Sequence, residues 1–129
     1  MEEALSIPGL SLYGAKYLRR PIDPLRDLLA LAELKRFIKK NRIDIVHTHR
    51  SKAGILGRWA AALAKTKIII HTVHGWSFNN FQKPWTRRLY ILLEKFSARF
   101  TDKIIVVSNH DREKGLHLKI GSECQYSLV

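Results

Sequence analysis

The run from Ile68 to Trp76 limits what this chain can fold into more than any other stretch. It reads Ile-Ile-Ile-His-Thr-Val-His-Gly-Trp, so β-branched residues lead directly into a histidine, a glycine and an aromatic residue. Consecutive β-branched residues favour a strand buried on both faces, as in a parallel sheet. Open α/β sheets bind ligands beyond the carboxyl ends of their strands, where His74 and Gly75 stand. Taken alone, His74 favours a structural role, with its ring bonded to a loop carbonyl.

Strands and helices alternate along the chain. An amphipathic helix is expected over 24–41, capped by Asp23 and Asn41 with Pro24 in its first turn. Strands are expected over 43–49, 67–73 and 103–107 and from 125 onward, and helices over 51–65, 84–100 and 108–118. A last helical turn at 2–6 and a short strand at 9–13 are also expected. The alternation predicts an α/β fold: a Rossmann-like parallel sheet with flanking helices.

Composition restricts the partners. The chain has 129 residues, which is one domain or part of one, and a net charge of +12. This excess favours an anionic partner (nucleic acid, acidic lipid or a phosphate-bearing substrate), although a solvated basic surface is an equal alternative. The single cysteine, Cys124, indicates a reducing compartment, and no stretch is apolar enough to span a bilayer. We expect a cytoplasmic protein, with contact at the inner face of the membrane as a further possibility.

Histidines near strand ends raise the question of a metal site. His47 and His49 are two apart in a strand, so both rings point to one face and could reach one ion together with His74. Later strand ends bring no carboxylate ligand, so we expect no metal. A possible anion site follows at the start of the next helix, in Arg50, Ser51, Lys52 and Gly54. Neither a dinucleotide fingerprint nor a P-loop is present.

Three segments together resemble glycosyltransferase family 4. Residues 44–58 resemble its D-I-V-H-x-H-x-x-K-A-G-x-x-G-R segment, residues 70–75 its H-T-x-H-G segment, and residues 101–108 its T-D-x-I-I-x-V-S segment. The resemblance implies a retaining, nucleotide-sugar-dependent transferase of GT-B architecture, active in polysaccharide biosynthesis without a bound metal or other cofactor. It implies a catalytic role for His74 through hydrogen bonding and electrostatics. Residues implied on the acceptor side are His49, Arg50, Ser51, Lys52, Gly54, Gly75, Trp76, Ser108 and Asn109.

The chain also departs from the family pattern. The first strand with its Gly-Gly loop and the C-terminal donor domain with its E-x7-E motif are missing from the sequence. We therefore expect residues 1–129 to form a partial N-terminal, acceptor-side domain that is inactive in isolation. The strand near 43–48 is expected to be an unpaired edge, which favours self-association.

The helix over 84–100 carries an apolar stripe at Trp85, Leu89, Leu92, Leu93, Phe96 and Phe100. We expect this stripe to pack on the sheet, and contact with anionic lipid is the alternative. Two other functions stay open from the residues alone. One is a basic, non-enzymatic nucleic-acid-binding module, and the other is a metal hydrolase using His47, His49 and His74. For the transferase that the resemblance implies, no nucleic acid is expected as a partner.

Overall fold

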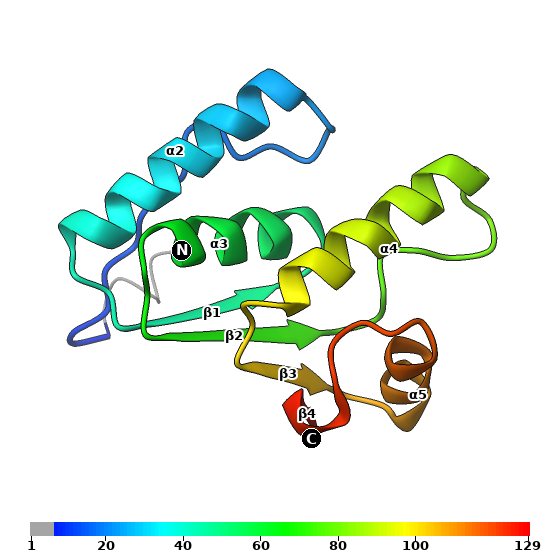
Figure 1. Ribbon diagram of the computed structural model, residues 1–129. Helices are drawn as coiled ribbons and strands as arrows, with labels where there is room; N and C mark the ends of the chain where they lie inside the picture. The colour runs from blue at the N-terminus through cyan, green and yellow to red at the C-terminus, as the bar shows by residue number, and fades with distance from the viewer. Residues whose placement is uncertain (1–6) are drawn as a thin grey trace.

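The computed structural model describes residues 7–129 and shows an α/β fold (Figure 1). The helical turn expected at 2–6 lies outside these residues. Four parallel strands form one sheet in the order β1-β2-β3-β4. The strands are β1 (Ile45–His49), β2 (Ile68–Val73), β3 (Lys103–Val106) and β4 (Tyr126–Leu128). The Rossmann-like parallel sheet is therefore confirmed.

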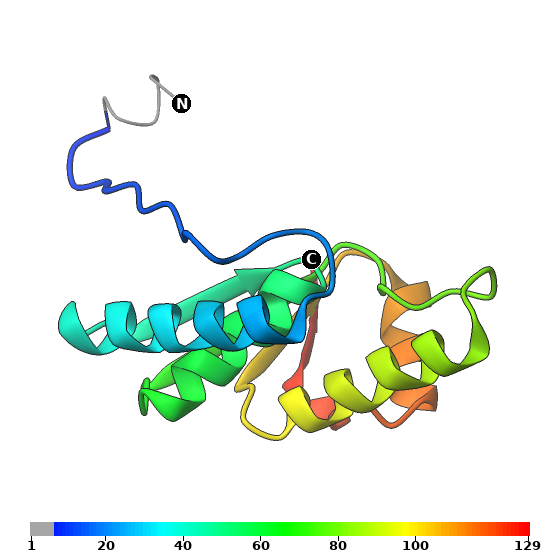
Figure 2. The same ribbon diagram turned by 90° about the horizontal axis from the view of Figure 1, so that it is seen from above.

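The helices are α2 (Pro24–Lys40), α3 (Lys52–Leu63), α4 (Pro84–Ala98) and α5 (Asn109–His117), and a short 3-10 turn, η1 (Glu123–Gln125), precedes β4. Helices α3 and α4 lie on one face of the sheet, α2 packs beside α3, and α5 lies near the carboxyl ends of β3 and β4 (Figures 1 and 2). None of the helices in residues 7–129 combines the length and apolar character needed to cross a bilayer.

The helix ends follow local rules. The side chain of Asp23 accepts a hydrogen bond from the Arg26 backbone N–H, and Pro24 follows in the first turn of α2. At the start of α5, Ser108 Oγ accepts from the Asp111 N–H at 3.1 Å. Both caps confirm the boundaries expected from the sequence.

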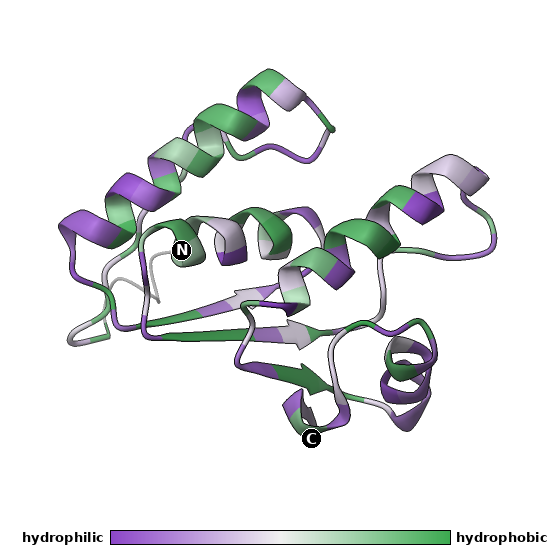
Figure 3. Cartoon of the chain, in the orientation of Figure 1, coloured by the Kyte–Doolittle hydropathy of each residue, from purple (hydrophilic) through white to green (hydrophobic). Residues whose placement is uncertain are grey.

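Apolar residues on the helix-covered face form the core. One cluster joins Val73, Val106 and Tyr126 of the sheet to Phe78 and Ile91, and a second joins Ile38, Ala60, Ala61 and Ile69. Strands β1 and β2 begin with apolar residues, and histidines and threonines follow in their carboxyl-terminal halves (Figure 3). The fold therefore gathers polar side chains at one edge of an apolar sheet.

The other face of the sheet is less covered. Thr48 faces α3, so the alternation of a strand places Ile45 and His49 on the opposite face, and Ile45 is 54% exposed. Within residues 7–129, β1 pairs only with β2, as expected for an edge strand. Strand β1 therefore exposes both its free edge and apolar Ile45 on the less covered face.

Two expectations are wrong. Residues 9–13 form no strand: Tyr13 stacks on Phe37 of α2 and donates to Glu33, so the end of this segment is held by α2 and not by a strand of the sheet. Most of the stripe predicted for this helix does not pack on the sheet: Trp85 is 64% and Leu92 62% exposed, whereas Phe100, which follows α4, packs against the second core cluster. The face that α4 buries instead carries Ile91, Glu94, Ser97 and Ala98.

Candidate functional site at the carboxyl edge of the sheet

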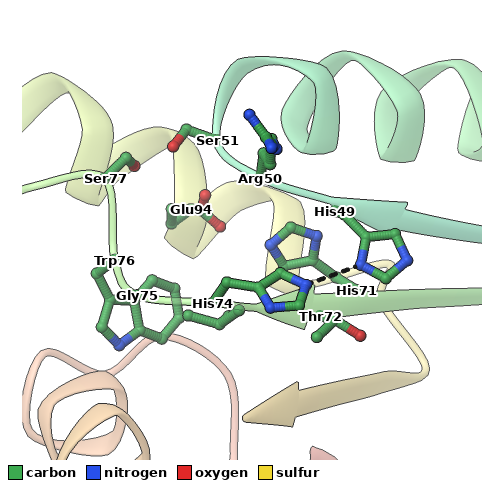
Figure 4. Close-up of a pocket in the computed structure, with 11 residues that line it drawn as sticks. His49, Arg50, Ser51, His71, Thr72, His74, Gly75, Trp76, Ser77 and Glu94 are labelled. Atoms are coloured by element: carbon green, nitrogen blue, oxygen red, sulfur yellow. Dashed lines mark hydrogen bonds between the residues drawn. The ribbon is translucent and has the colours of Figure 1, made fainter. Parts of the chain in front are cut away.

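A cavity of about 590 Å³ opens at the carboxyl ends of β1 and β2 (Figure 4). Its walls come from the turn between β1 and α3, from the end of β2 with the following loop, and from α4. Among the predicted site residues, it brings together His49, Arg50, Ser51, His74, Gly75 and Trp76. The volume falls in the range of small-molecule sites.

Side-chain hydrogen bonds hold the ends of β1 and β2 together. His47 Nε2 lies 2.7 Å from Thr72 Oγ1, and Thr48 Oγ1 lies 2.8 Å from His71 Nδ1. These pairs follow from the parallel register, in which Thr48 is opposite His71 and His49 is opposite Thr72. The polar ends of the strands are therefore fixed relative to one another.

His49 and His74 form the third pair across these strands. His49 Nδ1 lies 3.1 Å from His74 Nε2, and Figure 4 shows the two rings meeting at the side of the cavity. Burial lowers the pKa of His49, and the neighbouring His47 and His74 lower it further. Gly75 follows with φ +121, a conformation that L side chains rarely adopt, so glycine is required where the chain turns after His74.

His71 is a buried structural residue, as its place inside the strand indicates. It is 3% exposed, and burial together with the nearby Arg58 guanidinium lowers its pKa to about 3. A Cβ on Gly54 would lie 2.6 Å from His71 Cε1, so Gly54 allows α3 to approach β2 closely. Gly54 therefore acts here as a close-packing residue behind the cavity.

A buried ion pair joins α3 to α4 behind the cavity. Arg58 donates to Glu94 Oε2 at 2.7 Å and, through Nε, to the Gly54 carbonyl at 3.0 Å, with both side chains almost inaccessible to solvent. Burial raises the pKa of Glu94, and the Arg58 guanidinium opposes that rise. Glu94 also lines the cavity, so the pair links the cavity wall to the packing of two helices.

Basic residues gather at the start of α3. Arg50 has φ 65, and Ser51 makes no side-chain bond to the first turn of α3. A second hollow of about 340 Å³ beside the cavity, the arginine hollow, is lined by Arg19, Arg20, Arg50, Ser51, Lys52, Ala53 and Tyr90. Within residues 7–129, no carboxylate pairs with the three guanidinium groups.

Lys52 does not line the His74 cavity, although the family resemblance implies a place for it on the acceptor side. Its ammonium lies 2.5 Å from Asp27 Oδ1 and donates to the Arg19 carbonyl at 2.8 Å and to the Pro21 carbonyl. These bonds hold the segment before α2 against the start of α3. Lys52 thereby positions Arg19 and Arg20 beside Arg50, and it does not line the His74 cavity.

The remaining predicted residues lie around the cavity or outside it. Trp76 lines the cavity and donates from Nε1 to the Asp111 carbonyl at 2.8 Å, which joins the loop after β2 to α5. Ser108 is occupied as the cap of α5, and neither Ser108 nor Asn109 lines the cavity. Substrate contact by these two residues remains a prediction.

Among residues 7–129, the side chains do not assemble a metal-binding group. His47 and His49 point to one face as expected, with ring centroids 4.3 Å apart. His47 Nε2, however, is engaged by Thr72. In the part of the chain that the structure describes, no group of three or more His, Cys, Asp or Glu side chains is arranged to hold a metal ion.

Sequence reasoning did not anticipate Thr72, Glu94 or Arg58 as part of this site. Glu94 lies on the inner face of α4, and its partner Arg58 is 36 residues earlier in the chain. The signal that could have found Glu94 and Arg58 is a charged residue inside an otherwise apolar or small-residue helix face, because such a charge requires a partner.

Comparison with known proteins decides the family. The model of Glycosyltransferase Family 4 matches residues 6–123. The chain belongs to glycosyltransferase family 4. The resemblance carried by the three segments is thereby confirmed, and the family is one of glycosyltransferase-type enzymes. These matches do not favour the nucleic-acid-binding and metal-hydrolase alternatives.

Curated relatives agree with this family assignment. The chain is 43% identical over 94 residues to the Escherichia coli UDP-Gal:alpha-D-GlcNAc-diphosphoundecaprenol alpha-1,3-galactosyltransferase, covering 73% of this chain and 24% of that protein. It is 36% identical over 103 residues to the putative glycosyltransferase EpsD of Bacillus subtilis, covering 76% and 26%. It is 29% identical over 92 residues to the Escherichia coli O-antigen biosynthesis glycosyltransferase WbnH, covering 70% and 26%. The chain thus spans about a quarter of the length of these relatives.

Proposed function

We propose that this chain forms the acceptor-side wall of a sugar-transfer site in a retaining, nucleotide-sugar-dependent transferase of GT-B architecture. The observation that carries the proposal is the cavity at the carboxyl edge of the sheet, which brings His74 together with Arg50 and Ser51. A histidine and a helix start beside an arginine in one small-molecule-sized space support a catalytic group next to an anion-binding group. Family membership supports the reaction class.

His74 would act by hydrogen bonding and electrostatics. A fixed donor aimed at developing negative charge stabilises a transition state without reorganisation during the reaction. Its ring lies at the cavity side, held by His49, and Gly75 gives the backbone beside it room for a ligand. The transfer step needs no metal in this proposal, and the nucleotide-sugar enters as a substrate.

The acceptor in this proposal is a lipid-linked glycan whose diphosphate lies in the arginine hollow. Arg19, Arg20 and Arg50 converge there with no carboxylate partner among residues 7–129, and guanidinium groups match phosphate oxygens in pairs. One relative's name gives GlcNAc-diphosphoundecaprenol as its acceptor, which supports this class. The net charge of +12 is consistent with an anionic partner.

Isothermal titration of the 129-residue chain tests this acceptor class. The ligands are a GlcNAc diphosphate carrying a short prenyl chain and the same compound without the diphosphate. We expect measurable binding of the first only, weakened by about tenfold in Arg50→Ala because one charge-assisted contact is lost. Lys39→Ala, an exposed cation at the far end of α2, is the matched control and should bind normally. Equal binding of both compounds, or no effect of Arg50→Ala, would contradict the proposal.

Because the chain spans about a quarter of its relatives, we propose that sugar transfer needs parts those relatives carry and residues 1–129 do not. The 129-residue chain is expected to transfer no sugar from UDP-galactose to the diphosphate acceptor. Transfer by the purified chain would contradict this.

We also propose peripheral contact with anionic membrane through α4. The side chains that face outward include Trp85, Leu89, Leu92 and Phe96, with Arg88 and Arg99 beside them. Apolar side chains beside cations are the pattern of helices that lie on acidic lipid. Such contact would place the cavity near a lipid-linked acceptor.

A further inference from the structure

The contact between His49 and His74 links the proton positions of the two rings. The two rings come from adjacent strand ends, with centroids 5.4 Å apart and planes inclined by 27°. Thr48 turns inward to α3, so His49 lies on the opposite face of the sheet, beside His47. The pair therefore forms a small imidazole layer at the side of the cavity.

A nitrogen-to-nitrogen separation of 3.1 Å is a hydrogen bond, and such a bond needs one proton. In a neutral imidazole one ring nitrogen is a donor and the other an acceptor, so the bond makes one ring the donor and the other the acceptor. Each ring joins this bond through one nitrogen, so its second nitrogen is the one that can bond to other partners. The tautomers of His49 and His74 are therefore linked.

We propose that His49 is a positioning residue for His74: it donates from Nδ1 to Nε2 of His74 and holds His74 in the tautomer whose proton is on Nδ1. In this arrangement His74 keeps an N–H donor for a ligand. The direction of the bond rests on the proposed function, because a transfer site needs a donor toward developing negative charge. The linkage of the two rings rests on the geometry alone.

The surroundings of the pair favour this arrangement. The ring of His47 lies 4.3 Å from that of His49, and its Nε2 is held by Thr72, so it does not compete for His74. The other ionisable groups near the pair are Arg50 from the β1 end, His71 from β2, Arg58 from α3 and Glu94 from α4. Arg58 and Glu94 neutralise one another, and burial keeps His71 uncharged near neutral pH. Arg50 is the remaining cation beside the pair.

The test is the nitrogen chemical shifts of the His74 ring, measured by NMR on the 129-residue chain at pH 8. In the unsubstituted chain we expect His74 Nδ1 to carry the proton with about a tenfold preference, the effect of one hydrogen bond. His49→Ala should remove that preference. His49→Asn should keep it, because an amide N–H can replace the Nδ1 donor. His47→Ala is the matched control, since His47 bonds Thr72 and not His74, and it should leave the His74 shifts unchanged.

Two results would overturn the proposal: a proton on Nε2 of His74 in the unsubstituted chain, or the same His74 shifts in His49→Ala. Backbone amide spectra of each variant establish that the fold is retained. The measurement needs no donor or acceptor sugar, so it separates this proposal from the proposed function. If His74 loses its tautomer in His49→Ala while the chain binds no acceptor, the positioning role holds and the acceptor assignment fails.

Discussion

The ion pair between Arg58 and Glu94 provides the sharpest test of how the cavity wall is built. Arg58→Ala removes a guanidinium that is 0% exposed and leaves Glu94, 2% exposed, without its partner. Removing one member of a buried pair costs about 3–5 kcal/mol, because the other charge stays desolvated. Native domains have a free energy of unfolding of about 5–15 kcal/mol, so the loss is a large part of the total.

Urea unfolding followed by tryptophan fluorescence measures this loss. With a slope of about 2 kcal/mol per molar, the midpoint should fall by about 2 M in Arg58→Ala. The double variant Arg58→Met with Glu94→Leu replaces both charges by apolar groups of similar size. We expect it to lose only about 1 kcal/mol, the value of the bond from Arg58 to the Gly54 carbonyl. If Arg58→Ala is unfolded in water, the double variant should be folded.

The control is the exposed pair Lys67–Asp44, 3.2 Å apart, with side chains 78% and 68% exposed. Lys67→Ala should change the free energy of unfolding by less than about 0.5 kcal/mol. Similar losses in Arg58→Ala and Lys67→Ala, or a double variant as unstable as Arg58→Ala, would contradict a buried ion pair between Arg58 and Glu94.

The remaining predictions concern pH, self-association and lipid. The pKa of His71 is about 3 in the folded chain against 6.5 for the free side chain, so the unfolded chain binds a proton first and stability is lost as the pH falls from 6.5 toward 3. From pH 7 to pH 5, the free energy of unfolding measured in urea should fall by about 2 kcal/mol. The same fall in His71→Asn would contradict the assignment to His71. The open edge of β1 beside exposed Ile45 should cause concentration-dependent self-association in sedimentation, weakened by Ile45→Lys; a strict monomer at all concentrations would oppose this. The chain should bind vesicles containing acidic lipid and lose most of that binding in Trp85→Ser with Leu92→Ser, whereas equal binding to neutral vesicles would argue against the basic and apolar surface of α4.

Much of the fold was predictable from local chemistry. The helix over 24–41 was recognisable from its period, and the caps Asp23 and Ser108 located helix starts to within a residue. The β-branched runs located β2 and β3, because such runs are stable only where a sheet buries them. The direction of the strands followed from the helices between them.

The orientation of α4 was not predictable in the same way. Its largest apolar residues form one stripe, yet the helix turns Ile91, Glu94 and Ala98 inward. That choice depends on Arg58 of α3 and Ser97, which meet their partners only in the folded chain; Ser97 accepts from the Trp59 indole at 2.8 Å. Periodicity shows that an apolar stripe exists on the helix. It does not show which face of the helix is buried.

Part of the lining of the candidate site was predictable from the sequence, and its contacts were not. His74 and the Arg50–Gly54 turn were recognisable because strand ends and helix starts place ligand-binding groups. The bond from His49 to His74 depends on the register of β1 against β2, which a one-residue shift would abolish. The separate role of Lys52 depends on the path of residues 19–21, which no motif describes.

The most direct test of the central claim is the map of amide shifts when the labelled chain is titrated with the GlcNAc diphosphate carrying a short prenyl chain. The largest changes should fall at His74, Trp76 and Arg50, around the cavity at the carboxyl edge of the sheet. Changes confined to other surfaces, or none at millimolar ligand, would contradict the claim that this cavity receives the acceptor.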